Sequence, residues 1–94
     1  MQISWTPIAL RDLAAIRDYI AAEHPHAAAR QIAAIRSSVS RLSEFPYMGR
    51  NGRRAGTREL VVPRTPYIVA YRLEADAVVL LRVLHGRQRW PDRF

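Results

Sequence analysis

The feature that most constrains the fold is a pair of amphipathic stretches in the first half of the chain. In both, apolar residues recur three or four positions apart, which is the spacing of one face of an α-helix. The apolar positions are Ala9, Leu13, Ile16 and Ile20 in the first stretch and Ile32, Ile35, Val39 and Leu42 in the second. Thr6 followed by Pro7 predicts the start of the first helix, and Pro25 suits the first turn of the second. Each helix has only one apolar stripe, so the antiparallel hairpin that they form needs a further apolar surface, which we expect to be a sheet.

The rest of the chain supplies the strands of that sheet. Runs of β-branched and aromatic residues predict strands at residues 2–5, 58–62, 67–73 and 78–84. Residues 50–57 are rich in glycine and arginine and are expected to form a loop, and residues 74–77 the turn of a hairpin. The order β-α-α-β-β-β predicts an α+β fold, in which an antiparallel two-helix hairpin packs on one face of a largely antiparallel sheet. We expect residues 1–94 to form a single domain.

Strand alternation divides the residues of the last two strands between two faces. If Leu73 pairs with Val78, one face is smoothly apolar and should meet the helices, and its residues are Ile68, Ala70, Leu81 and Val83. The opposite face would present Tyr67, Val69, Tyr71, Leu80, Arg82 and Leu84. A slip of one residue in the register would exchange the two faces. The arginine on the second face either covers an apolar surface with its stem or belongs to a surface that binds phosphate or a partner protein.

Positive charge is concentrated in the second half of the chain. All fifteen basic residues are arginine, and the formal net charge is +7. Residues 1–48 hold five arginines against four acidic residues, a balance of +1, whereas residues 49–94 hold ten against four, a balance of +6. Such a field attracts phosphate polymers or an acidic protein partner at long range.

Several classes of function lack the residues that they require. The chain has no cysteine, which excludes disulfides and thiolate metal sites, and we expect neither a metal nor a cofactor. It has no lysine-containing phosphate loop, no Gly-x-Ser-x-Gly motif and no cluster of carboxylates for a metal-dependent nuclease. No apolar run approaches the ~20 residues of a membrane span. The N-terminus also lacks the pattern of a signal peptide, so we expect a cytoplasmic protein without membrane contact.

The end of the last predicted strand carries the best candidates for chemistry. His85 and Arg87 follow this strand, Arg82 lies near its end, and Arg58 opens an earlier strand, so that both Arg58 and Arg82 could approach His85. RNA cleavage needs a base, an acid and cations that stabilise the phosphorane, and these four residues could supply such catalytic groups. The residues expected to bind a partner or RNA are Arg50, Arg53, Arg54, Tyr67, Tyr71, Arg89 and Trp90. A purely structural role stays open for His85 as a strand-end hydrogen-bonding residue and for Trp90 as an anchor of the C-terminus.

Four segments of the chain resemble the toxins of the RelE/ParE superfamily. They are residues 45–50 (FPYMGR), 56–62 (GTRELVV), 67–73 (YIVAYRL) and 79–87 (VLLRVLHGR). Together with the strand and the two helices that precede them, the resemblance covers nearly the whole chain. It implies a toxin of a type II toxin–antitoxin system, which stops growth and is held silent by a cognate antitoxin.

The two branches of this superfamily act on different targets. RelE-like members cut mRNA on the ribosome without a metal, whereas ParE-like members poison DNA gyrase. The RelE branch typically has an arginine after the aromatic residue that opens the third strand, where this chain has Ile68, and lysines on the preceding strand, where it has Glu59 and Val61. The resemblance therefore favours a non-enzymatic inhibitor of gyrase. The alternatives are a ribosome-dependent mRNA endoribonuclease and a plain nucleic-acid-binding module, although the chain has no helix-turn-helix or RNP-like motif.

Overall fold

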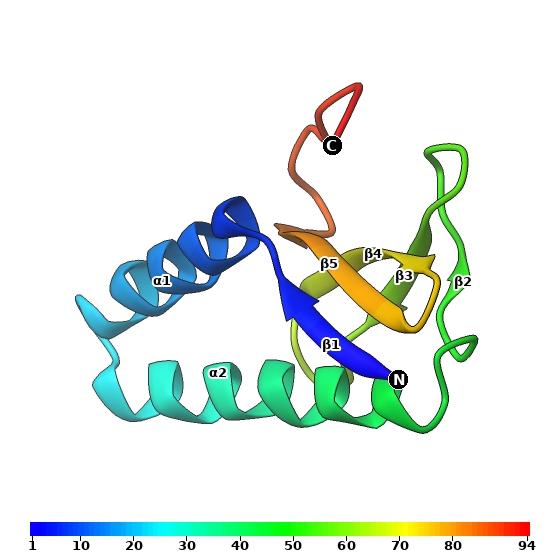
Figure 1. Ribbon diagram of the computed structural model, residues 1–94. Helices are drawn as coiled ribbons and strands as arrows, with labels where there is room; N and C mark the ends of the chain where they lie inside the picture. The colour runs from blue at the N-terminus through cyan, green and yellow to red at the C-terminus, as the bar shows by residue number, and fades with distance from the viewer.

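The computed structural model describes residues 1–94 and contains two helices and a five-stranded sheet. The elements are β1 (Gln2–Trp5), α1 (Pro7–Ala21), α2 (Pro25–Ser40), a 3-10 turn η1 (Arg41–Ser43), β2 (Arg50–Asn51), β3 (Arg58–Val61), β4 (Tyr67–Glu74) and β5 (Ala77–His85). The strand order is β1-β5-β4-β3-β2, in which β1 pairs in parallel with β5 and the other pairs are antiparallel. The antiparallel helices cover one face of the sheet, and residues 86–94 run over the other (Figure 1).

The start of α1 is attached to β5 by one side chain. Thr6 Oγ1 accepts a hydrogen bond from the amide of Ala9 at 3.2 Å and donates one to the carbonyl of Leu80 at 2.8 Å. Pro7 occupies the first turn, where its missing N–H leaves no helical bond unmade. The predicted helix start is therefore confirmed, and the same hydroxyl links β5 to α1.

The main core lies between the helices and the sheet. The predicted helical stripes supply its lower layer, and their buried members are Ala9, Leu13, Ile35, Val39 and Leu42. The sheet supplies the upper layer, which consists of Leu60, Val62, Tyr67, Val69, Tyr71, Val78, Leu80 and Val83. The predicted packing of a helical hairpin on one face of a sheet is thus confirmed.

The assignment of the two sheet faces from strand alternation was wrong, although Leu73 does pair with Val78 as predicted. The helices meet the face of Tyr67, Val69 and Tyr71, and not the face of Ile68 and Ala70. The tyrosine-bearing face is bulkier and can be buried because the hydroxyl of Tyr71 has two polar partners, the carbonyl of Pro46 and the amide of Gly49.

A bulge in β5 accounts for the remaining misplaced side chains. Tyr71 lies opposite Leu80 and Ala70 lies opposite Arg82, so Leu81 has no partner in β4. The extra residue shifts the alternation by one position for the rest of the strand. Val83 therefore joins the main core on the helix side, whereas Leu84 packs on the opposite face with Ile68 and Trp90. A prediction that assumes strict alternation of side chains along the strand could not account for this shift.

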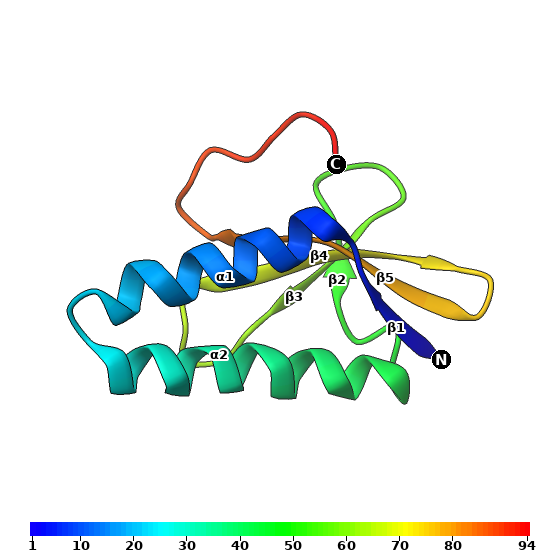
Figure 2. The same ribbon diagram turned by 60° about the vertical axis from the view of Figure 1, so that its left-hand side comes forward.

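The expected loop at residues 50–57 begins with a short strand. Arg50 and Asn51 form β2, which pairs with Glu59 and Arg58 at the edge of the sheet. Figure 2 shows the remainder of this loop beside the C-terminal residues, on the side of the sheet away from the helices. No helix of the structure has the length and apolar character needed to cross a membrane.

Candidate functional site

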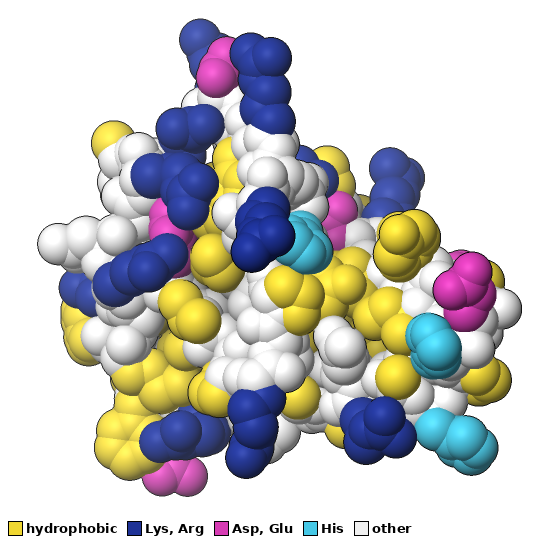
Figure 3. Space-filling model, turned by 180° about the vertical axis from the view of Figure 1, so that it is seen from behind, with side chains coloured by type: hydrophobic (Ala, Val, Ile, Leu, Met, Phe, Trp, Pro, Cys, Tyr) yellow, Lys and Arg dark blue, Asp and Glu magenta, His cyan; other side chains and the backbone are white.

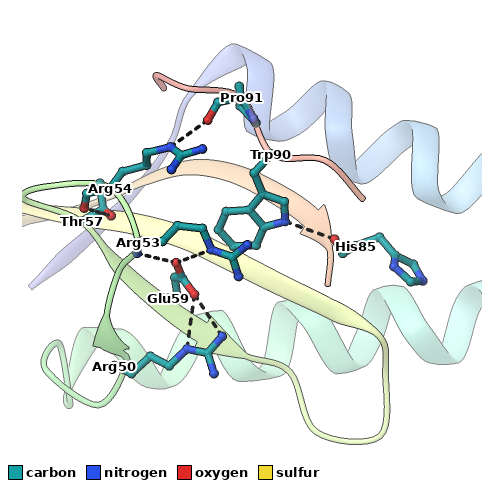
Figure 4. Close-up of polar contacts among 8 residues, drawn as sticks. All are labelled: Arg50, Arg53, Arg54, Thr57, Glu59, His85, Trp90 and Pro91. Atoms are coloured by element: carbon teal, nitrogen blue, oxygen red, sulfur yellow. Dashed lines mark hydrogen bonds and ion pairs between the residues drawn. The ribbon is translucent and has the colours of Figure 1, made fainter. Parts of the chain in front are cut away.

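The outer face of the sheet is covered by the C-terminal tail, residues 86–94. Trp90, which is 6% exposed, packs on Ile68 and Leu84 in a small apolar cluster of its own. Its indole N–H donates a hydrogen bond to the carbonyl of His85 at 3.2 Å (Figure 4). The tail therefore folds back over the end of β5, and its aromatic side chain closes the second core.

The arginine-rich loop, residues 50–57, holds the tail from the other side. The guanidinium of Arg53 lies over the ring of Trp90, with its carbon 3.5 Å from the ring centroid. Arg54 Nε donates to the carbonyl of Pro91 at 2.9 Å, and the hydroxyl of Thr57 donates to the carbonyl of Arg54 at 2.6 Å. The loop and the tail thus form one surface, although about forty residues separate them in sequence.

A buried carboxylate organises this surface. Glu59 is 3% exposed. Its Oε1 accepts hydrogen bonds from Nε and Nη2 of Arg50 at 3.3 and 3.0 Å. Its Oε2 accepts hydrogen bonds from the amide and Nε of Arg53 at 2.8 and 3.2 Å. Burial acts to raise the pKa of Glu59, but the hydrogen bonds from Arg53 and Arg50 outweigh it, so that the pKa lies below its usual value. Glu59 is therefore an anion that fixes two cations.

Arg82 has a structural partner on the first helix. Its Nε and Nη2 donate to Oδ2 and Oδ1 of Asp12 at 2.7 and 3.0 Å, and Asp12 Oδ2 also accepts from the amide of Val83 at 2.9 Å. The side chains of Arg82 and Asp12 are 19% and 14% exposed. The hydrogen bonds to Asp12 raise the pKa of Arg82 above its usual value, although burial opposes this shift. The guanidinium is therefore engaged within the fold.

His85 lies at the end of β5 in a tight turn. Its Nδ1 accepts a hydrogen bond from the amide of Arg87 at 3.0 Å, which requires a lone pair on Nδ1 and places the ring proton on Nε2. Its own amide donates to the side-chain oxygen of Gln88 at 2.8 Å. The imidazole meets the ring of Tyr67 edge to face, with 5.7 Å between the centroids. The side chain of Arg87 is exposed and forms no ion pair.

Tyr71 and Arg58 fix the connection between η1 and β2. The buried hydroxyl of Tyr71 donates to the carbonyl of Pro46 at 2.8 Å and accepts from the amide of Gly49 at 2.9 Å. Burial raises the pKa of Tyr71. A Cβ atom on Gly49 would lie 2.5 Å from that hydroxyl, so only glycine fits there. Arg58 Nη1 donates to the carbonyl of Gly49 at 2.7 Å and stacks near Tyr47.

The structure does not gather the four residues that were proposed for chemistry. His85 lies opposite Tyr67 on β4, whereas Arg58 lies opposite Tyr71, four residues away or about 13 Å along the strand. Arg58 was expected from the sequence to approach His85. In the structure it does not. Arg82 lies on the tail side and, with Arg89, lines a hollow of about 390 Å³ beneath residues 90–92.

The residues that do come together belong to the arginine-rich loop and the tail. Arginine side chains surround this region in the space-filling view (Figure 3). The gathered side chains that the sequence analysis named are Arg50, Arg53, Arg54, Arg89 and Trp90. Glu59 lies at the centre of the group and was not predicted to do so, although it is the one acidic residue between Arg50 and Arg72. No group of three or more His, Asp or Glu side chains is arranged to hold a metal.

Comparison with known proteins identifies the family. A model of the ParE toxin of type II toxin–antitoxin systems (parDE) matches residues 3–90. The Y4kP protein of Sinorhizobium fredii is 48% identical over 97% of this chain and 94% of its own, and Toxin RelE2 of Caulobacter vibrioides is 40% identical over 90% and 94%. A chain from the chromosomal ParDE TA system of P. aeruginosa has a TM-score of 0.82 and 27% identity, covering 90% of this chain and 95% of that one. The chain therefore belongs to the ParE toxin family of type II toxin–antitoxin systems, within the RelE/ParE superfamily.

Proposed function

We propose that this toxin stops growth by binding and inhibiting DNA gyrase in the cytoplasm, without catalysis. The observation that carries the proposal is the separation of His85, Arg58 and Arg82. An endoribonuclease needs its base, its acid and its cations around one phosphate. Here Arg58 lies four residues along the sheet from the position of His85, and Arg82 is bound to Asp12. A toxin that acts by binding needs no such convergence.

The surface made by the arginine-rich loop and the tail supports a binding role. Arg53 and Arg50 are held in place by Glu59, and Trp90 is held by the sheet beneath it. Side chains that are already ordered lose little conformational entropy when a partner binds. Arg89 and Arg93 are exposed beside them and form no ion pairs, so they are available to an acidic partner surface.

A ribosome-dependent mRNA endoribonuclease is the second candidate function. It is favoured by His85 Nε2, which makes no hydrogen bond within the chain, and by exposed Arg87 two residues away. An imidazole with one free nitrogen beside a cation could act on a phosphodiester if the ribosome supplied the remaining groups.

The cognate partner that we propose is an antitoxin with an acidic segment. The chain carries a net charge of +7, and the related P. aeruginosa chain comes from a ParDE toxin–antitoxin system. From the sequence, such a segment is expected to cover an exposed sheet face and the arginines after residue 49, but the helices cover one face of the sheet and the tail covers the other. We therefore place the antitoxin segment over the arginine-rich loop and the tail. We propose that the toxin that carries both is a single domain.

One experiment separates the two target classes. The purified toxin is added to a gyrase supercoiling reaction and, in parallel, to ribosomes programmed with a defined mRNA. We expect loss of supercoiling with intact mRNA. Cleaved mRNA with unaffected supercoiling would instead establish the endoribonuclease.

A further inference from the structure

The connection between η1 and β2 holds three large apolar side chains in water. Phe45 is 54% exposed, Tyr47 67% and Met48 36%, and none of them belongs to either apolar core. The amide of Met48 donates to the carbonyl of Phe45 at 3.2 Å, which closes a β-turn and brings the three side chains together on the surface. We call residues 45–48 the apolar turn. Figure 3 shows hydrophobic side chains gathered at the lower left of the view, beside a group of arginines.

The backbone of the apolar turn is fixed by two side chains of the sheet. The hydroxyl of Tyr71 donates to the carbonyl of Pro46 at 2.8 Å and accepts from the amide of Gly49 at 2.9 Å. Nη1 of Arg58 donates to the carbonyls of Tyr47 and Gly49 at 3.3 and 2.7 Å. The sheet therefore holds in place a backbone whose large side chains it does not pack. Such a turn loses little conformational entropy when a partner binds to it.

The side chains of the apolar turn are of the kind that forms the centre of a protein interface. Aromatic residues and methionine are enriched there, and the residues that contribute most to binding lie in its middle. Single exposed apolar side chains are common on any surface, but a contiguous group of them marks an interaction site. The ring of Tyr47 is also held, because the guanidinium carbon of Arg58 lies 4.9 Å from its centroid. The apolar turn is therefore suited to anchor a protein partner.

The size of the apolar turn decides against a second copy of the chain as the occupant. Because aromatic side chains offer roughly 150–250 Å² each, the three partly exposed side chains offer about 300 Å². Two copies joined through this turn would bury about 600 Å² in total, whereas a specific interface buries about 1,000 Å² or more. The apolar turn must therefore be one part of a larger interface that extends over neighbouring residues.

The charge of the neighbouring residues indicates the chemistry of the partner. Residues 41–58 hold five arginines and one acidic residue, a balance of +4. Such a surface repels a second basic copy and attracts an acidic segment. The apolar turn is followed at once by Gly49 and by β2, the edge strand from which the arginine-rich loop continues. The turn and the loop therefore lie along the same edge of the sheet (Figure 1).

We propose that the apolar turn anchors the acidic segment of the antitoxin. Apolar side chains of that segment pack on Phe45, Tyr47 and Met48, and its carboxylates face the arginines from Arg50 onward. The inference rests on the antitoxin proposed above and extends its binding surface along β2. It does not depend on the action on gyrase.

The first test measures the affinity of the toxin for the antitoxin, taken as the product of the reading frame beside the toxin gene. We expect Phe45→Ser and Met48→Gln each to weaken binding about tenfold or more, mainly through faster dissociation. The loss should be the same at low and high salt, because salt does not screen an apolar contact. The loss in Arg89→Ala should instead shrink as salt rises. Tyr19→Ser, which removes a side chain 83% exposed on α1, is the matched control and should change nothing.

The outcomes separate this inference from the proposed partner. Both variants should keep the free energy of unfolding of the wild type, since neither side chain belongs to a core. Wild-type affinity in both folded variants, or an equal loss in Tyr19→Ser, would overturn the anchor but leave the antitoxin as the partner. An antitoxin that does not bind the wild-type toxin would overturn both.

A second test identifies the occupant directly. Phe45 is replaced by the photoreactive p-benzoylphenylalanine, and the full-length toxin is illuminated alone, with the antitoxin and with gyrase. We expect a crosslink to the antitoxin, with the crosslinked peptide identified by mass spectrometry as an acidic segment that carries apolar residues. A crosslink to gyrase but not to the antitoxin would assign the turn to the target surface, and a crosslink between toxin chains would assign it to a second copy. Either result would overturn the proposal.

Discussion

Arg82 and Asp12, 70 positions apart in the chain, form a two-pronged ion pair that ties α1 to β5. Asp12 also accepts from the amide of Val83, just beyond Leu80, where the pairing of β5 with β1 ends. One carboxylate thus replaces the strand partner that β5 lacks at its free edge. A loss of toxicity on replacing Arg82 has to be separated from a loss of fold.

Replacement of Arg82 tests this structural role. We expect Arg82→Ala to lower the free energy of unfolding by about 2 kcal/mol, because Asp12 keeps an amide partner but loses its counter-charge in a mostly dehydrated position. Urea unfolding measures the change. Arg11→Ala removes an exposed arginine beside Asp12 and should change the free energy by less than about 0.5 kcal/mol. Equally small changes in the free energy of unfolding of both variants would contradict a structural role for Arg82.

Glu59 predicts a specific dependence of stability on pH. The pKa of Glu59 in the folded chain lies below its unfolded value of 4.5, so the folded chain binds fewer protons at this group than the unfolded chain. The stability that Glu59 provides is therefore complete above the unfolded pKa and is lost as the pH falls through the folded pKa. We expect acidification below pH 4.5 to destabilise the wild type more than Glu59→Gln. Parallel urea-unfolding curves of the two proteins over the acid range would contradict this.

The stacking of Arg53 on Trp90 predicts that the loop and the tail are held together. Arg53→Ala should lower the free energy of local opening of the tail by about 0.5–1 kcal/mol, which is the usual strength of an exposed cation–π contact. Hydrogen exchange of the tail amides measures this, since it reports local opening. Arg89→Ala serves as the control, because Arg89 is exposed and does not stack on the indole. If Arg89→Ala speeds exchange as much as Arg53→Ala, the stacking contact contributes nothing.

The proposed antitoxin surface predicts binding that depends on salt. Affinity should fall as salt rises, because charges on the two partners attract each other through water. Arg89→Ala and Arg93→Ala should slow association, whereas Arg17→Ala on the exposed side of α1 should not. Association rates measured by surface plasmon resonance at two salt concentrations would show this. If only Arg17→Ala changes the association rate, the antitoxin binds the helices and not the proposed surface.

The helices and the order of helices and strands along the chain could be predicted from the sequence because their signals are local. The apolar spacing around Leu13 and Ile35 and the pair Thr6–Pro7 depend only on neighbours along the chain. The two sheet faces could not be predicted in the same way. The bulge at Leu81 reverses the alternation, and Tyr71 is buried only because Pro46 and Gly49 satisfy its hydroxyl.

The candidate site shows the same limit. Clustered arginines could be recognised as surface candidates from composition, whereas Trp90, for which a binding role and an anchoring role were both open, is buried on Ile68 and Leu84. The arrangement of Arg50 and Arg53 depends on Glu59, whose burial between them is set by the pairing of β2 with β3, and Arg82 is held by Asp12, 70 positions away. The placement of Arg58 beside His85 failed because the register of β3 on β4 puts Arg58 opposite Tyr71, four residues from the Tyr67 that lies opposite His85.

His85 gives the sharpest separation of the two proposed targets. For a gyrase inhibitor, His85→Gln should remove one contact among several and weaken inhibition by about 1–3 kcal/mol at most, with a comparable loss in Arg87→Ala. For an endoribonuclease, the same change should slow mRNA cleavage by about 10²–10⁴-fold while ribosome binding persists. Supercoiling and cleavage assays on both variants, each checked for folding by circular dichroism, measure these effects. Glutamine can still accept a hydrogen bond from the amide of Arg87, so the turn should survive. Full inhibition of gyrase by both folded variants would exclude this end of β5 from the target surface and leave the arginine-rich loop to carry it.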